Sequence, residues 1–402
     1  MQNLSLDTLV AVARTATGFF WKAGWAFVLG YAISGMIQAF VPKARLTRAL
    51  GDPGAKSVSL ATLFGAASSS CSFAALAAAR ALVVKGAHFV AAVAFMFAST
   101  NLVIELGILI LIFLGWPYLA AELIGGLVLI VISSIILRLT VPRSWRDAAR
   151  ERATRQVDPE EEDFDWRDRI RSREGWRMVG RNFVGDWQMV WEEILIGFSI
   201  AGLMATVVPP SFWETIFLVE AADSLPAWLI ALQNAAVAPF VAAATFIGSM
   251  GNIPLATVLD SNGVLFAGIM GFIYSDLMVP PLVAINARYY GLRMALTIAG
   301  IMYVSIVATA LILDTAFHGL GISLESSREI AETTRFAMDY TFWLNIVFAV
   351  VAGGLVFLSR EGKDEGGHDH HDHDSGGPSV KRVIALVAAV IMAAGLVLGL
   401  FI

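Results

Sequence analysis

The stretch Phe89–Leu139 decides the fold class, and it reads FVAAVAFMFASTNLVIELGILILIFLGWPYLAAELIGGLVLIVISSIILRL. Two apolar runs, Phe89–Leu114 and Tyr118–Leu139, flank the turn Gly115-Trp116-Pro117, through which a helix cannot continue. Each run has at least the ~20 residues that an α-helix needs to cross about 30 Å of hydrocarbon. The stretch therefore predicts two membrane helices that run out and back.

Apolar residues dominate the rest of the chain as well. Its 402 residues are 57% hydrophobic and only 15% charged, with a mean hydropathy of +0.71, whereas soluble proteins average roughly 25% charged residues. We therefore predict an all-α integral membrane protein, a polytopic helix bundle of about eight spans plus two re-entrant hairpins, arranged as inverted-topology repeats. The net charge of −5 offers no basic face for a nucleic acid.

Basic loops set the predicted orientation. Pro42–Ser57 and Val141–Asp186 are rich in lysine or arginine, which marks them as cytoplasmic. The predicted divisions are a first membrane repeat at 21–140 with a hairpin at 60–84, a cytoplasmic loop at 141–186, a second membrane repeat at 187–315 with a hairpin at 228–259, and C-terminal helices at 316–402 with a His-rich linker at 361–377. If each hairpin returns to the side it entered from, the basic loops all lie inside and the two hairpins enter from opposite sides.

Polar residues interrupt the two hairpins at matching places. Transporters with inverted repeats bind substrate near the midplane, between broken segments of this kind. The candidate substrate-binding residues are Ser69, Ser70, Cys71, Ser72, Asn101, Gly251, Asn252 and Pro254. Their hydroxyl, thiol and amide groups could replace the hydration shell of a solute. The alternative is that these small residues only allow helices to pack closely.

Two acids lie inside the apolar helices that follow the hairpins. Glu105 and Asp276 are flanked by apolar residues, and ionisable groups at bilayer depth usually mark a substrate path or a proton relay. We expect them to couple transport to an ion. The alternative is a structural pair with Arg80 or with an amide.

Histidines and aspartates alternate in the linker between the last two apolar segments. His368, His370, His371 and His373 could capture a divalent metal, because imidazole and carboxylate suit Zn²⁺, Cu²⁺ and Ni²⁺. A flexible, solvated loop without a dedicated role is the alternative, since the glycine-rich flanks impose no fixed geometry. We expect no cofactor.

The motifs of both halves together resemble the ArsP/YraQ-like permease family. The stretches are Ser69-Ser70-Cys71-Ser72 and the segment 95–107 in the first half, and Gly251-Asn252-Ile253-Pro254 and the segment 272–277 in the second. The resemblance covers roughly 60–291 and implies a permease. Its arsenical-efflux branch implies a trivalent organoarsenic substrate near the cysteine, and another branch implies divalent-metal efflux with a His-rich loop.

The expected function is therefore transport rather than catalysis. We expect a secondary transporter of the inner cell membrane that exports a small solute, a metalloid or a metal species, by alternating access, with the lipid bilayer and the solute as its partners. A channel-like pore, or a metal-sensing or structural protein using the His-rich loop, is the alternative. No HExxH, GxSxG or Walker pattern is present to indicate an enzyme.

Overall fold

Helices are the only regular elements among the residues that the computed structural model describes, with no strand among them. These residues are 6–40, 50–51, 54–68, 72–154, 166–219, 225–245, 247–322, 330, 334, 336, 338–360 and 380–398. Seven helices within them are long and apolar enough to cross a membrane: Leu6–Phe40, Phe89–Phe113, Trp116–Thr140, Arg173–Val207, Ala227–Thr245, Leu292–Gly319 and Tyr340–Arg360. The chain is thus an all-α polytopic membrane protein, as the sequence predicts.

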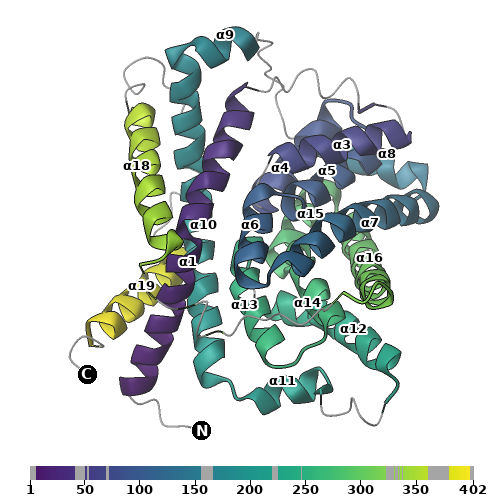
Figure 1. Ribbon diagram of the computed structural model, residues 1–402. Helices are drawn as coiled ribbons and strands as arrows, with labels where there is room; N and C mark the ends of the chain where they lie inside the picture. Colours follow the sequence, from purple (N-terminus) through teal and green to yellow (C-terminus); the bar gives the residue numbers. More distant parts are fainter. Residues whose placement is uncertain are drawn as a thin grey trace. The chain divides into compact units, whose positions relative to one another are not determined.

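The contacts divide the chain into two compact units, whose helices Figure 1 labels along the sequence. Unit 1 comprises Met1–Val41, Asp165–Val208 and Glu329–Ile402. Unit 2 comprises Pro42–Phe164 and Pro209–Arg328. Both units draw on distant parts of the sequence, so each must assemble from segments that the other interrupts.

Unit 1 is built on the pair of α1 (Leu6–Phe40) and α10 (Arg173–Val207). Two further helices, α18 (Tyr340–Arg360) and α19 (Val380–Leu398), pack against this pair. Helices in lipid gain no hydrophobic driving force from each other and so associate through close van der Waals packing. Gly202 provides such a contact, because a Cβ on it would lie 2.8 Å from Ala16.

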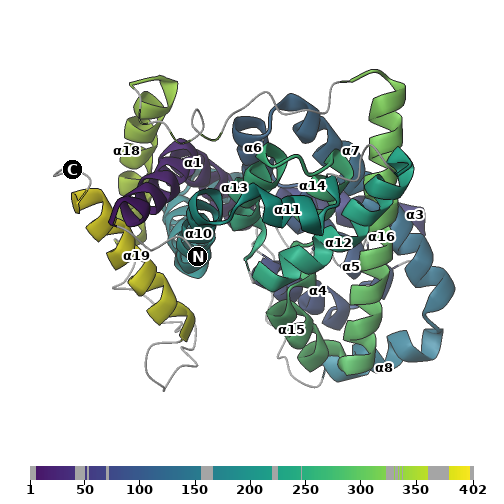
Figure 2. The ribbon, with the colours of Figure 1, turned by 90° about the horizontal axis from the view of Figure 1, so that it is seen from below.

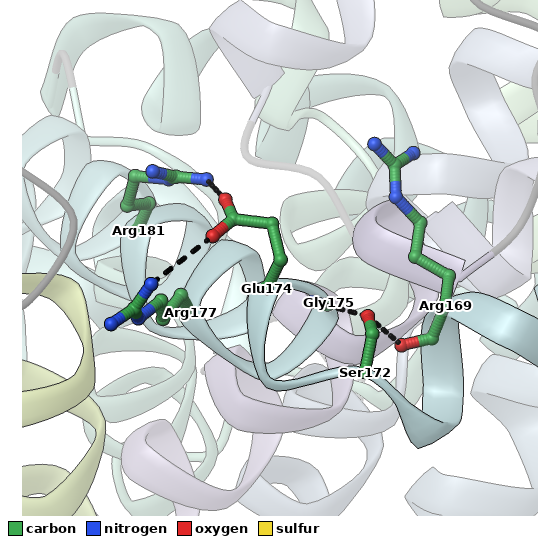
Figure 3. A network of polar contacts seen from close by, with 6 residues as sticks. All are labelled: Arg169, Ser172, Glu174, Gly175, Arg177 and Arg181. Carbon is green, nitrogen blue, oxygen red and sulfur yellow. Dashed lines mark hydrogen bonds and ion pairs between the residues drawn. The ribbon is translucent and has the colours of Figure 1, made fainter. Parts of the chain in front are cut away.

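Both helices of this pair are longer than the sequence predicts. The predicted membrane repeats begin at 21 and 187, whereas α1 begins at Leu6 and α10 at Arg173, and each helix runs unbroken for 35 residues. The short helix α9 (Trp166–Arg171) precedes α10. Figure 3 shows the start of α10, where the Ser172 hydroxyl accepts a hydrogen bond from Gly175 N at 3.0 Å and caps the helix. Glu174 pairs with Arg177 and Arg181 one and two turns on. The first third of α10 is therefore helical, although its charged residues make it too polar to enter lipid.

Unit 2 contains two halves with the same order of elements. The first half is α3 (Ala55–Ser68), α4 (Ser72–Val84), α5 (Phe89–Asn101), α6 (Ile104–Phe113) and α7 (Trp116–Thr140), followed by the short α8 (Arg143–Thr154). The second half starts with the short α11 (Pro210–Ile216) and continues with α12 (Ala227–Thr245), α13 (Ser249–Ser261), α14 (Phe266–Ile273), η2 (Asp276–Met278), α15 (Pro280–Tyr290) and α16 (Leu292–Gly319). Each half is thus a pair of helices, then a broken helix, then a long helix (Figure 2).

Hydrogen bonds close the base of each helix pair. Before and after α3–α4, His88 N donates to Leu50 O at 2.7 Å. In the second pair, Asn234 of α12 joins the residues on either side of α12–α13. Its Nδ2 donates to Phe217 O, before α12, at 2.7 Å, and its Oδ1 accepts from Leu265 N, after α13, at 3.1 Å. Each pair therefore starts and finishes at one end of the unit.

The two bases lie at opposite ends of α7. Near its C-terminus, Arg138 donates to Gly54 O beside the first base. Near its N-terminus, the Tyr118 hydroxyl donates to Asp260 Oδ1 at 2.8 Å beside the second base. Tyr118 and Arg138 are 20 residues apart on α7, which separates the bases by about 30 Å at 1.5 Å per residue. The two halves consequently enter unit 2 from opposite ends.

His88 joins the first base to the start of α5. Its Nδ1 accepts a hydrogen bond from Val90 N, which only the ring form with a lone pair on that nitrogen can do. Burial, helped by Arg146, Arg138 and Arg150, lowers the pKa of His88 below its usual value. The ring is therefore kept neutral near pH 7, and the cap is lost as the pH falls through this lowered pKa.

A glycine substitution tests the packing inside unit 2. A Cβ on Gly65 of α3 would lie 2.5 Å from Phe95 O and 2.8 Å from Ala98 Cβ of α5, so Gly65→Ala should destabilise the protein by about 1–3 kcal/mol. Gly300→Ala is the matched control, because a Cβ there meets nothing within 4 Å. Thermal unfolding in detergent measures both, and equal midpoints would show that α3 and α5 do not pack as described.

Candidate functional site

The helix that follows each helix pair is broken, where the sequence predicts continuous spans. The predicted span Phe89–Leu114 divides into α5 and α6 around Leu102 and Val103, and the apolar stretch 264–285 of the second half divides into α14, η2 and α15. In the second half the cause is Pro280 and Pro281, which lack the amide protons that a continuous helix would donate to the carbonyls of residues 276 and 277. The Val279-Pro280-Pro281 sequence is the signal that could have revealed this break.

The first break has a different cause. Side chains at the end of α5 bond back to their own helix: Ser99 Oγ donates to Met96 O at 3.1 Å, and Asn101 Nδ2 donates to Phe97 O at 3.0 Å. Such bonds compete with the backbone ladder and weaken it. Val103 then takes an extended conformation, with φ −98° and ψ 146°, before α6 starts. Both breaks therefore follow from local chemistry and interrupt the helical hydrogen-bond ladder inside unit 2.

A hydrogen bond joins the first half to the second at these breaks. Ser72 Oγ, at the start of α4, donates to Asp276 Oδ2 at 3.0 Å, and Leu277 N donates to Asp276 Oδ1 at 2.8 Å. The Asp276 side chain is fully buried and Ser72 is 2% exposed. The structure thus brings together two residues that are 204 positions apart in sequence and that were singled out for different roles.

The corresponding helices of the other half also meet. Just as α4 packs on α15, α13 packs on α6. Gly251, Asn252 and Pro254 lie buried on α13, and Glu105 lies buried on α6. Neither amide atom of Asn252 has a hydrogen-bond partner in the described part of the chain, and Asn101 Oδ1 also lacks one. Buried amides without partners are rare in proteins and point to groups reserved for a ligand.

Arg80 was considered above as a structural partner for the buried acids. In the structure it contacts Tyr289 and α8. Its guanidinium lies 4.5 Å from the centre of the Tyr289 ring, and its Nη2 donates to Ala153 O of α8 at 3.2 Å. These contacts hold α8 against α4 and α15.

Several predicted site residues lie outside the described residues. Ser69, Ser70 and Cys71 are in this group, and so are His368, His370, His371 and His373. Within the described ranges no group of three or more His, Cys, Asp or Glu side chains could hold a metal ion. The roles predicted for the cysteine motif and for the His-rich linker stay predictions.

Sequence analysis missed one buried acid, Glu122 of α7. It is 1% exposed, and neither of its carboxylate oxygens has a hydrogen-bond partner in the described residues. The hydroxyl of Tyr274, at the second break, donates to the neighbouring Ala121 O at 2.9 Å. The available signal was a lone acid inside the apolar run Tyr118–Leu139, the same signal that identified Glu105 and Asp276.

Two broken helices that face buried polar groups, in an all-α bundle whose halves enter from opposite ends, define the chain as a polytopic membrane transport protein. The profile of the ArsP_1 family, described as "Predicted permease", matches residues 9–315, so the chain belongs to this family. It is 38% identical over 328 residues to "Putative permease Rv2963" of Mycobacterium tuberculosis (strain ATCC 25618 / H37Rv), with 79% of each chain covered. No solved structure matches the chain.

The bond between Ser72 and Asp276 can be tested by removing its donor. Ser72→Ala should cost about 1–3 kcal/mol of stability, because it removes a buried hydrogen bond to the Asp276 carboxylate. Ser305→Ala is a matched control, since the buried Ser305 hydroxyl bonds only to Ile301 O of its own helix. Thermal unfolding of Ser72→Ala, of Asp276→Asn and of the double variant Ser72→Ala/Asp276→Asn gives the coupling energy. Additive effects would mean that Ser72 and Asp276 do not interact.

Proposed function

We propose that the chain is a secondary transporter that exports a small solute across the inner cell membrane by alternating access between the two halves of unit 2. The observation that carries this proposal is the bond between Ser72 and Asp276, which ties the end of one helix pair to the break of the opposite half. Inverted-repeat transporters bind their substrates at such junctions, because broken helices offer backbone groups that a continuous helix would satisfy internally. The family description, a permease, agrees with this proposal.

The proposed substrate site combines residues from both halves. Ser69, Ser70, Cys71 and Ser72 contribute from the first helix pair, Asn101 from the first break, and Gly251, Asn252 and Pro254 from α13. The unpartnered amide atoms of Asn252 and Asn101 would hydrogen-bond the solute. Glu105 and Asp276 would carry the coupling ion. Cys71 and the family resemblance favour a soft metalloid or metal species as substrate.

The proposed orientation places α8 in the cytoplasm and α11 outside. Because Cys71 is the only cysteine, Cys71→Ser gives a background for single-cysteine labelling. In this background we expect Ser211→Cys on α11 to react with a membrane-impermeant maleimide in intact cells, and Glu151→Cys on α8 only after permeabilisation. Both positions are exposed. The reverse pattern would contradict the orientation, and equal labelling in intact cells would contradict the separation of the two bases.

Transport itself is tested with the full chain in proteoliposomes. We expect saturable flux of one member of a panel of arsenite, methylarsenite, Zn²⁺, Cu⁺ and small anions, together with thermal stabilisation by that member. Asn252→Ala should weaken binding about tenfold, the effect of losing one substrate hydrogen bond of about 1.4 kcal/mol. Gly300→Ala is the control. Flux that does not saturate would indicate a pore rather than a transporter, and unchanged binding in Asn252→Ala would exclude α13 from the site.

A further inference from the structure

The buried acid Glu122 requires neutralisation. Its position, six residues after the first residue of α7, places it about 9 Å along the helix axis from that end. An ionised carboxylate that is buried without hydrogen bonds costs several kcal/mol, even after the protein relaxes around it. Neither Glu122 oxygen has a hydrogen-bond partner in the described residues, although the side chain is 1% exposed. A cation or a proton must therefore accompany this group.

Among the described residues, the charged group that acts on Glu122 is another acid. The Tyr274 hydroxyl donates to Ala121 O at 2.9 Å, which places the segment that carries Asp276 against α7 beside Glu122. Asp276 interacts electrostatically with Glu122, and Tyr274 also faces it. Of the helices packed on α7, α5 and α14 carry no charged residue, and α6 carries Glu105. α16 carries Arg293, Tyr303, Asp314 and His318. Arg293 stacks on Trp145, 3.5 Å from its ring centre, and Asp314 pairs with His318, so these charges are engaged elsewhere.

We propose that Glu122 and Asp276 together form the proton-binding site of the transporter, sharing one proton in the conformation described here. Two acids that interact electrostatically in a buried site cannot both ionise freely, and they titrate as a pair. Each acid comes from a different half, Glu122 from α7 and Asp276 from η2. This inference rests on the proposed function, because it names the coupling ion of that transporter.

The surroundings favour a proton over a metal ion. Mg²⁺ or Ca²⁺ would need about six or more oxygen ligands and the space for them. Beside Glu122, Tyr274 and Leu313 pack against Gly125, and Leu102 Cδ2 lies 2.6 Å from where a Cβ on Gly126 would be. These contacts fill the space on α7 next to the acid. A proton needs no cavity and only one oxygen.

The proton balance of the cycle follows from these positions. In one conformation a proton from water binds a carboxylate oxygen of the pair, forming an O–H bond and cancelling one negative charge. In the other conformation that O–H bond breaks, and the proton leaves to water on the opposite side. For export, one proton would enter as the solute leaves, and no electron is transferred. The break at Tyr274–Val279 is the element that can move Asp276 relative to α7.

Infrared titration of the purified full chain in lipid tests the proposal without a substrate. A protonated carboxylic acid has a C=O stretching band that a carboxylate lacks. We expect this band at neutral pH in the wild-type protein, its loss in Glu122→Gln, and its disappearance at a lower pH in Asp276→Asn, which removes the neighbouring negative charge. Glu122→Asp should retain the band. Glu214→Gln, on α11 and outside the site, should leave it unchanged.

The outcomes separate this proposal from the proposed function. An unchanged band in a folded Glu122→Gln protein would overturn the proton site. If that variant fails to fold, an unchanged pH course in Asp276→Asn would overturn it equally. Proteoliposomes supply the second readout: a transported solute whose flux keeps its pH dependence in Glu122→Gln would contradict the inference alone. Absence of any transport together with a band that requires Glu122 would contradict the proposed function alone.

Discussion

Unit 2 depends on one constraint, that a backbone amide or carbonyl inside hydrocarbon must find a partner within the protein. Lipid offers no hydrogen bonds, so non-helical backbone at membrane depth is tolerated only where protein encloses it. Both breaks obey this rule. Asn101 is 1% exposed at the first, and Tyr274, Ser275 and Asp276 are fully buried at the second. Enclosure in turn requires that other helices surround each break on every side, which a single hairpin could not provide. The helix pairs entering from opposite ends supply that cover.

Close helix approach is what makes the enclosure tight. α14 carries Gly268 and Gly271, and a Cβ on either would lie about 3 Å from atoms of α12. On α7, Gly125 and Gly126 let Tyr274 and Leu102 pack against the helix surface. The same glycines place the Tyr274 hydroxyl within reach of Ala121 O. Small residues therefore have a second effect beyond packing, because they bring the backbone of the second break against the helix that carries Glu122.

The sequence predicts the fold class and the matching order of the halves, because both follow from hydrophobic block length and from proline and glycine placement. It also identifies Ser72 and Asp276, although not that they bond to each other across 204 positions. Long-range pairing depends on which helix faces meet, and runs that are apolar on all sides carry no facial pattern to reveal this. The helical start of α10 at Arg173 was missed for another reason, because its first turns are charged and resemble a soluble loop. Glu122 was visible as a lone acid, but only its burial without partners sets it apart from an acid that pairs with an amide.

The two halves of unit 2 repeat the same order of helices but carry their buried acids at different positions, and this difference matters for coupling transport to a proton. The halves repeat the same order of elements from opposite ends, so two conformations that exchange the roles of the halves can have similar packing energies. Acids placed equally in both halves would then be equivalent in the two conformations and could not bias one over the other. In this chain the long helix of the first half carries Glu122, whereas its counterpart α16 carries the apolar Ile298 at the same distance from its start. In the proposed mechanism, protonation of a pair drawn from unlike positions changes the energies of the two conformations by different amounts, and this difference would allow a proton gradient to drive the cycle.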